Sequence, residues 1–236
     1  MPFVRRMLPI SAALLFAVAC ASTKVSNQEN RVANEEIPRP GRILVYDFGV
    51  QAADVAPDSV LAGEPDAEQS PTQQQVAEGR ELGSEVARVL AEKITELGIP
   101  AYEASGRMAP ALKDLVIRGY FASIDKGNAA ERMLIGFGSG SAELKTVVEI
   151  YQMTPYGLRK LGQGDVASGG PKGPGAAVPA AVAIATANPI GLIVTSAVKI
   201  GSEASGRSTI EGRAKSTAEA IADELKPRMQ KRGWIQ

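Results

Sequence analysis

The stretch Leu115–Asp125, LVIRGYFASID, decides the fold of this chain. Its β-branched and aromatic residues predict a strong β-strand, because such side chains pack well on a pleated surface. Ile43–Val50, ILVYDFGV, has the same character and is apolar enough to lie at the centre of a sheet. We therefore expect the folded domain to begin near Gly41 and to be built around these two strands.

Two more strands are expected after Leu115–Asp125. Apolar and charged residues alternate along Glu143–Gln152, which predicts a strand with one face against the core and one face in water. Pro155–Gly157 has the composition of a turn and leads into a shorter predicted strand, Leu158–Val166, so these strands form an antiparallel meander. A weak strand over Pro100–Ala104 is expected at an edge of the sheet.

Two amphipathic helices complete the predicted α+β fold. The first starts at the capping-box pattern Ser70–Gln73, continues with apolar residues at helical spacing and ends at Gly98. The second includes Ala214–Met229, and Gly233 and Trp234 follow it as in a Schellman motif, in which the tryptophan packs back on the helix. The sequence thus predicts a small mixed or antiparallel sheet of about four to five strands with both helices on one face.

The segment Gly169–Gly206 is rich in glycine and alanine, and almost every residue from Ala176 to Val198 is small or apolar. Asn188, Pro189 and Gly191 interrupt this run, so we expect two short helices folded as a hairpin, each too short to cross a bilayer. Three alternatives stay open for the hairpin: packing on the sheet of its own chain, association with copies or partners, and insertion into lipid.

Residues 1–19 have the three parts of a signal peptide: a positively charged start, an apolar run from Ile10 to Val18 and small residues before Cys20. The apolar run is too short for a resident membrane helix. Ala17–Cys20 resembles the lipobox of bacterial lipoproteins, with Ala17 in place of the favoured leucine. Such a site implies cleavage before Cys20 and attachment of diacylglycerol and an N-acyl chain such as palmitate to this cysteine.

The residues after Cys20 predict where the domain lies. Ala21, rather than aspartate, follows the cysteine, and by resemblance to sorted lipoproteins this implies the periplasmic face of the outer membrane, or the cell membrane if the host lacks an outer one. Residues 20–40 lack aromatic residues and apolar periodicity, which predicts a flexible tether of about 25 Å that holds the domain, residues 41–236, off the lipid. Residues 51–69 form a predicted acidic loop without the spacing of an EF-hand.

The composition excludes several kinds of chemistry. The chain has no histidine and Cys20 is its only cysteine, so Ser-His, Cys-His and haem-type arrangements are excluded, together with most zinc sites. The 26 basic and 26 acidic residues balance, which gives no support for a nucleic-acid partner. The glycine-rich Gly136–Ser141 precedes a strand and lacks the lysine of a P-loop, so no nucleotide cofactor is expected.

Catalysis would have to use carboxylates, and nothing in the sequence places two of them together at the separation found in hydrolases. We therefore expect no catalytic, cofactor-binding or metal-binding residue, and no cofactor apart from the lipid on Cys20. The carboxylates considered are Asp47, Asp125, Glu149 and Asp165.

The lipobox, LVIRGYF, ERMLIGFGSGSAELKTVVEIYQ, SGGPKGPG and the closing GWI together resemble a family of bacterial lipoproteins with a domain of unknown function, DUF 4410. The resemblance covers nearly all of the chain after Cys20 and carries over no site residue. More distantly, the order of strands and helices is similar to small α+β domains of envelope lipoproteins related to the curli secretion subunit and to the amino-terminal domain of TolB, which implies oligomerisation.

These observations favour a lipid-anchored, non-enzymatic periplasmic protein that acts through protein-protein contacts in envelope assembly or secretion. Its partners would be the membrane and either an envelope protein or its own copies. The alternative is a membrane-associated oligomer or channel component that uses the 169–206 hairpin. A small-molecule binding module would need a pocket.

Overall fold

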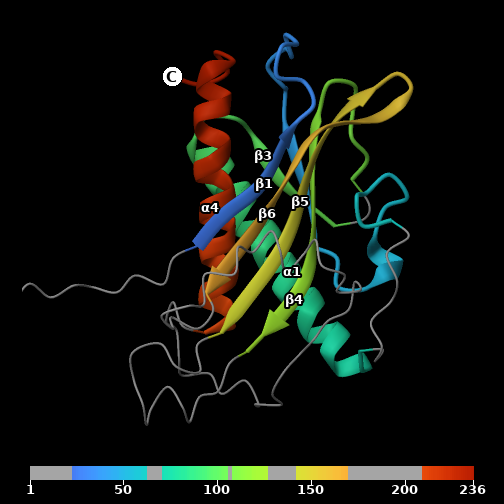
Figure 1. Ribbon diagram of the computed structural model, residues 1–236. Helices are drawn as coiled ribbons and strands as arrows, with labels where there is room; N and C mark the ends of the chain where they lie inside the picture. The colour runs from blue at the N-terminus through green and yellow to red at the C-terminus, as the bar shows by residue number, and fades with distance from the viewer. Residues whose placement is uncertain (1–22, 63–70, 106–107, 127–141, 170–208) are drawn as a thin grey trace, which may run out of the picture.

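The computed structural model describes residues 23–62, 71–105, 108–126, 142–169 and 209–236. In this part of the chain, a six-stranded sheet with the order β1-β6-β5-β4-β2-β3 is covered on one face by two long helices (Figure 1). The strands are β1 Thr23–Asn30, β2 Ile43–Tyr46, β3 Ala101–Ala104, β4 Leu115–Asp125, β5 Glu143–Thr154 and β6 Gly157–Gly169. The helices are α1 Gln73–Glu96, α4 Ile210–Lys231 and the 3-10 helix η1 Ala52–Asp54. The predicted α+β class is confirmed, and the sheet has more strands than expected.

The sheet combines a parallel and an antiparallel part. β2 pairs in parallel with β3 on one side and with β4 on the other, and α1 connects β2 to β3. β4, β5, β6 and β1 pair antiparallel in that order, so the predicted meander is present. Parallel neighbours need a long crossover such as a helix, whereas β5 and β6 need only the turn between Thr154 and Gly157.

The main core lies between the sheet and the two helices. α1 packs on β2 and β3, α4 packs on β1, β5 and β6, and the helices contact each other. Phe48, which follows β2, joins α1 to the sheet, since its N–H donates to the carbonyl of Gly83 at 3.3 Å. A Cβ on Gly119 of β4 would lie 2.1 Å from the Phe48 ring, and one on Gly83 would lie 2.4 Å from the Phe48 carbonyl oxygen. Both positions therefore require glycine.

The start of α1 differs from the prediction by a shift of the capping box. Thr72 is the N-cap: its hydroxyl accepts from the Gln75 N–H at 3.3 Å, and the Gln75 side chain accepts from the Thr72 N–H at 2.7 Å. The predicted start at Ser70 is wrong because Ser70–Gln73 and Thr72–Gln75 both match the capping-box pattern, and the second pair makes the bonds. The helix ends at Glu96, just before Gly98, which has a φ of +101°.

The end of α4 is the Schellman motif that the sequence predicts. Gly233 has a φ of +67°, and its N–H donates to the Gln230 carbonyl at 2.9 Å. The Trp234 N–H donates to the Met229 carbonyl, also at 2.9 Å. Trp234 is buried in the main core, as expected, and its indole N–H donates to the Ile37 carbonyl at 3.0 Å.

The prediction of a flexible tether over residues 20–40 is wrong for residues 23–40, the part that the structure describes. Thr23–Asn30 is an edge strand, β1, paired with β6, and the residues after it run over the C-terminal half of α4. Val32 and Ile37 are buried in the main core. The sequence pattern missed β1 because an edge strand is held by main-chain hydrogen bonds, which need no apolar periodicity.

The alternation along β5 predicted that its second face lies in water. In the structure, the middle of this face is buried. Val147, Glu149 and Tyr151 are all buried there. The beginning of the acidic loop is bonded to this face, since the N–H of Val60 donates to Glu149 at 2.9 Å. A local pattern gives no sign of a loop that folds back over a strand, and the prediction of a wet face is therefore wrong at this position.

Several predicted features lie outside the described residues. They are the signal peptide and Cys20 within residues 1–22, the end of the acidic loop within 63–70, the glycine-rich motif within 127–141 and the hairpin within 170–208. They stay predictions. Neither of the long helices in the described part of the chain is apolar enough to cross a membrane.

Candidate functional site

One end of the domain, which we call the Thr23 end, gathers the start of β1, the ends of β4 and β6, the start of β5 and the start of α4 (Figure 1). The strand register establishes this arrangement. Thr23 pairs with Ser168, Ser168 pairs with Leu144, and Leu144 pairs with Ile124. Positions that are far apart in the sequence therefore form one row across four neighbouring strands, at the same end of the sheet.

Arg213 fixes the first turn of α4 to this end. Its Nε donates to the Ala142 carbonyl at 2.9 Å, and the residue is only 1% exposed. Gly169 lies against it, since a Cβ there would be 2.7 Å from Nε. Burial lowers the pKa of the Arg213 guanidinium, and the nearby charge of Glu143 raises it. Within the described residues, Nη1 of Arg213 is buried without a hydrogen-bond partner.

The Thr23 end is also where the chain leaves and re-enters the described domain. Lys126 and Ala142 lie on either side of residues 127–141, and Gly169 and Thr209 lie on either side of residues 170–208. The glycine-rich motif and the predicted hairpin are therefore both attached at this end. Cys20 is attached there as well, because only two residues separate it from Thr23.

A groove between α1 and α4 adjoins the Thr23 end. Its volume is about 470 Å³, and it is lined largely by charged side chains of α1 together with Lys126 and Glu211. Four of these charges are paired: Lys126 binds Glu78, which lowers the pKa of that carboxyl, and Arg88 binds Glu85 at 2.6 Å. The four paired side chains therefore neutralise one another, and we assign no ligand to this groove.

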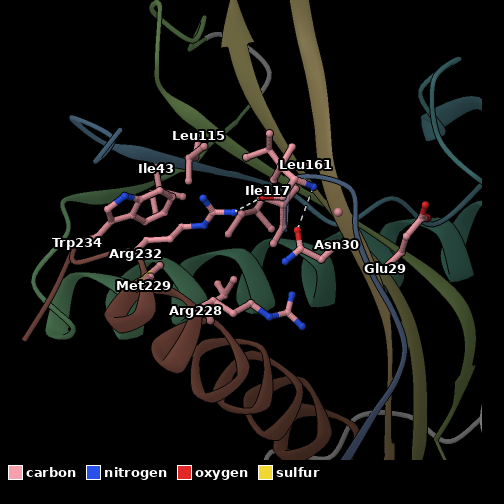
Figure 2. Close-up of a pocket in the computed structure, with 14 residues that line it drawn as sticks. Glu29, Asn30, Ile43, Leu115, Ile117, Leu161, Arg228, Met229, Arg232 and Trp234 are labelled. Atoms are coloured by element: carbon pink, nitrogen blue, oxygen red, sulfur yellow. Dashed lines mark hydrogen bonds between the residues drawn. The ribbon is translucent and has the colours of Figure 1, made fainter. Parts of the chain in front are cut away.

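The opposite end of the domain, which we call the Trp234 end, contains a small apolar cavity of about 70 Å³ (Figure 2). Trp234, Met229 and Ile117 are among its lining residues, with Arg228 and Arg232 beside them. The two arginines bind β1 and the segment after it: Arg228 donates to the side chain of Gln28 in β1 at 2.5 Å, and Arg232 donates to the carbonyl of Val32 after β1 at 3.0 Å. Small-molecule sites usually enclose about 300–1,000 Å³, so we assign this cavity to imperfect core packing.

A buried polar cluster lies on the helix-free face of the sheet. Glu149 binds Lys160 and also accepts from the Tyr151 hydroxyl at 2.8 Å. Burial, together with this hydrogen bond to a carboxylate, raises the pKa of Tyr151. Arg118 stacks on the Tyr151 ring at 5.3 Å and reaches Asp58 of the acidic loop at 3.5 Å. The cluster binds Asp58 and Val60 of the acidic loop to the sheet. Its charged and polar side chains are hydrogen-bonded or paired with one another.

The structure places the four carboxylates named from the sequence in different surroundings. Asp47 lies beside Glu103, a partner the sequence did not suggest, and burial together with that carboxyl raises the pKa of Asp47. Glu103 in turn accepts from the Ser84 hydroxyl at 2.7 Å. Glu149 is paired with Lys160, Asp125 is the last residue of β4, and Asp165 accepts from Asn27 at 2.7 Å.

Sequence reasoning missed the Asp47–Glu103 pair because Asp47 directly follows β2 and Glu103 lies in β3, and these neighbouring parallel strands are joined by a helix. Their alignment depends on the register of β2 with β3, which pairs Tyr46 with Ala104. Among the described residues, no group of three or more metal-ligating side chains occurs.

Comparisons with known proteins identify a family and a loose structural likeness. The family model described as Domain of unknown function (DUF4410) matches residues 43–187, which is more than half of the chain. Two crystal structures of the PelC dodecamer from Paraburkholderia phytofirmans, one of them a single-substitution variant, have TM-scores of 0.42 and 0.41. Both are 11% identical and cover 87% of this chain and 96% of their own. No curated protein matches the chain.

Proposed function

The chain belongs to the family described as Domain of unknown function (DUF4410), and from its own residues we propose that it is a lipid-anchored, non-enzymatic periplasmic protein. It acts through contacts with other envelope proteins, in envelope assembly or secretion, at the periplasmic face of the outer membrane. One observation carries the proposal: the strand β1 begins at Thr23, and only two residues separate it from the lipobox cysteine Cys20.

The short distance between Cys20 and β1 supports a role at the membrane surface. An extended chain covers at most about 3.6 Å per residue, so Thr23 lies within about 11 Å of Cys20. β1 is paired with β6, and the Thr23 hydroxyl lies 3.0 Å from that of Ser168. Lipid on Cys20 would therefore hold the domain itself close to the membrane, where a partner in the same membrane is within reach.

The non-enzymatic part of the proposal rests on composition and on the pairing of the charged groups. The chain has no histidine, and the proposed lipid uses its only cysteine. Glu149, the most buried of the four carboxylates, is committed to Lys160, Tyr151 and the N–H of Val60. These groups stabilise the fold and leave protein contacts as the function best supported.

The Trp234 end is the proposed contact surface for a partner. Tyr156, in the turn between β5 and β6, is 100% exposed, and Leu112, just before β4, is 60% exposed. Both positions belong to this end, since the N–H of Lys113 donates to Met153 at the end of β5. Aromatic side chains are enriched at protein interfaces, so an exposed tyrosine at the end opposite Thr23 suits this role.

The anchor is tested by labelling cells that express the full chain with radioactive palmitate and by separating their membranes. We expect label in the protein and recovery in the outer-membrane fraction, with both lost in Cys20→Ala. Ser22→Ala is the matched control and should behave as the unmodified chain. Equal membrane recovery of Cys20→Ala and of the unmodified chain, with no label in either, would rule out the proposed anchor.

The contact surface is tested by placing a photo-crosslinking residue at Tyr156 or, as a control, at Lys215 near the start of α4. We expect an adduct of one defined mass from position 156 in intact cells and none from 215. The adduct should be lost in Cys20→Ala, because the partner is held in the same membrane. Absence of any adduct from position 156 would count against a partner at the Trp234 end.

A second candidate is a membrane-associated oligomer or channel component that uses the 169–206 hairpin. The position of Gly169 and Thr209 favours it, because both lie at the end next to Cys20. The native mass of the lipidated protein in mild detergent tests it, with Cys20→Ala as the soluble control. A defined multiple of the chain mass for both forms would support assembly through the protein, and a monomer for both would exclude this candidate.

A further inference from the structure

We infer that the start of α4 is a binding site for a compact oxyanion, with the guanidinium of Arg213 as the main contact. The ligand chemistry is that of a phosphate group, either free or carried by a lipid headgroup. The inference depends on the burial and the hydrogen bonds of Arg213 and is independent of the proposed lipid on Cys20.

Arg213 is a buried cation without a counter-charge among the described residues. The residue is 1% exposed, and its Nη1 is buried without a hydrogen-bond partner. The one hydrogen bond that the guanidinium makes to a described residue runs from Nε to the Ala142 carbonyl, which has no formal charge. Arginine stays protonated in proteins, and a buried charge is costly unless an opposite charge pairs with it. This cost points to an anion beside Arg213.

Two described acids near Arg213 in the chain or in space do not act as its counter-ion. Burial lowers the pKa of the Arg213 guanidinium, and the charge of Glu143 opposes this effect. However, the Glu143 carboxylate lies 3.6 Å from Nζ of Lys145. Glu211 is exposed, and residues two positions apart on a helix do not face each other. The positive charge of Arg213 therefore stays available to an added anion.

The first turn of α4 supplies main-chain donors at the same place. The Thr209 hydroxyl accepts from the Gly212 N–H at 3.2 Å, and the Thr209 carbonyl accepts from the Arg213 N–H at 2.9 Å. The N–H groups of Ile210 and Glu211 have no acceptor inside the helix, as at the start of any α-helix. Helix side chains lean toward the N-terminus, which brings the guanidinium beside this turn. The helix dipole and the guanidinium therefore favour an anion together.

The main chain at Gly169 fixes the position of the guanidinium. A Cβ on Gly169 would lie 2.7 Å from Nε and 3.0 Å from Cζ of Arg213, and 2.1 Å from the Ala142 carbonyl oxygen. The φ of +98° at Gly169 is also one that favours glycine. The guanidinium is thus held in place before a ligand binds, and its remaining N–H donors suit the oxygens of a phosphate group.

The experiment follows thermal unfolding of the Cys20→Ala chain, which carries no lipid, as sodium phosphate replaces sodium chloride at constant ionic strength. We expect the Tm to rise and then level off, because a ligand that binds only the folded chain stabilises it until the site is saturated. Arg213→Met removes the buried cation, and Lys215→Met is the matched control, since Lys215 is an exposed cation on the same helix. The rise should be lost in Arg213→Met and kept in Lys215→Met.

A second measurement needs no change at Arg213. In NMR spectra of the Cys20→Ala chain, phosphate should shift the main-chain N–H signals of Ile210, Glu211 and Gly212 until the site is saturated. Short-chain phosphatidylglycerol, added below its micelle concentration, separates the two sources of the phosphate group. Tighter saturation by this lipid assigns a headgroup as the ligand, and tighter saturation by inorganic phosphate assigns the free anion.

The site would be overturned by N–H signals that saturate with neither probe. A rise of the Tm that is equally large in Arg213→Met would overturn it as well, because phosphate would then act elsewhere on the chain. Either result leaves the proposed anchor untouched, since palmitate labelling of Cys20 measures that separately.

Discussion

Glu149 and Lys160 are charged side chains that the fold removes from water on the helix-free face. Their side chains are 0% and 8% exposed, in that order. Taking both charges out of water is costly, so the pair is tolerable only because each charge has its partner and Glu149 also accepts from Tyr151 and Val60. The acidic loop depends on this pair, because Val60 is bound to the same carboxylate.

Lys160→Met should therefore destabilise the domain strongly, by about 3–5 kcal/mol, because it leaves Glu149 as an unpaired buried charge. Urea unfolding followed by circular dichroism measures the loss. The double variant with Glu149→Gln removes both charges and keeps an acceptor for the Val60 N–H, while the new amide N–H can donate to the Tyr151 hydroxyl oxygen, so it should recover much of the stability. If Lys160→Met alone is as stable as the unmodified chain, this account of the Glu149–Lys160 pair is contradicted.

Asp165 predicts a pH dependence of stability. Burial raises the pKa of its carboxyl, which outweighs the opposing effect of the hydrogen bond from Asn27. The folded protein therefore binds this proton more readily than the unfolded chain does, so the group adds stability below its unfolded pKa and loses it as the pH rises through the folded value. Asp165→Asn should raise the Tm at pH 7 and change it little at low pH.

The measurement is the Tm of Asp165→Asn and of the unmodified chain, followed by thermal unfolding from low pH to pH 7. Asp223→Asn, on the exposed side of α4, is the control for removing one negative charge. If Asp165→Asn lowers the Tm at pH 7, or changes it equally at all pH values, burial of the carboxylate is not the dominant effect.

At the scale of elements, the end of α4 shows how a short motif positions a whole segment. The Schellman bonds of Gly233 and Trp234 turn the chain so that the indole reaches the Ile37 carbonyl. Arg39 reinforces this contact, since its Nε donates to the Trp234 carbonyl at 2.9 Å. A helix ending thus fixes the segment that connects β1 to β2.

Gly233→Ala should cost about 1–2 kcal/mol, because a left-handed backbone is unfavourable for a residue with a Cβ. The cost comes from the backbone alone, since no atom lies within 4 Å of the position a Cβ would take. Gly233→Asn should cost less, because asparagine tolerates this conformation better. Chemical denaturation of the two variants is the check, and equal stability of Gly233→Ala and the unmodified chain would exclude the strain.

At the scale of the whole molecule, residues 23–40 are an integral part of the domain rather than a tether. β1 forms one edge of the sheet, and Val32 and Ile37 add apolar contacts to the main core. Trp234 depends on the same segment for its indole hydrogen bond. The domain therefore extends from one edge strand, β1, to the other, β3.

A chain shortened to residues 41–236 should therefore be less stable than residues 21–236 by several kcal/mol, since burying each of Val32 and Ile37 alone contributes about 1.5–3 kcal/mol. A fall in the Tm and an increase in the fluorescence sensitivity of Trp234 to a soluble quencher are the expected results. A tether would predict no change in either, and that outcome would contradict the role given to β1.

The sequence by itself determined the elements whose signals are local. The apolar run Leu115–Asp125 is β4 with the predicted limits, helical spacing identified α1 and α4, and the glycine after α4 predicted its Schellman ending. These features depend on residues within a few positions of one another, so their physics is contained in the order of side chains.

Only the tertiary structure decided what depends on residues far apart in the chain. The polar segment Thr23–Asn30 became a strand because β6 supplies its hydrogen-bond partners, and Glu149 became buried because Lys160 and Val60 close over it. The register of β1 with β6 also brought Thr23 to the end of the domain where the chain leaves at Gly169. No periodicity records such pairings, because their energy arises only when distant segments meet.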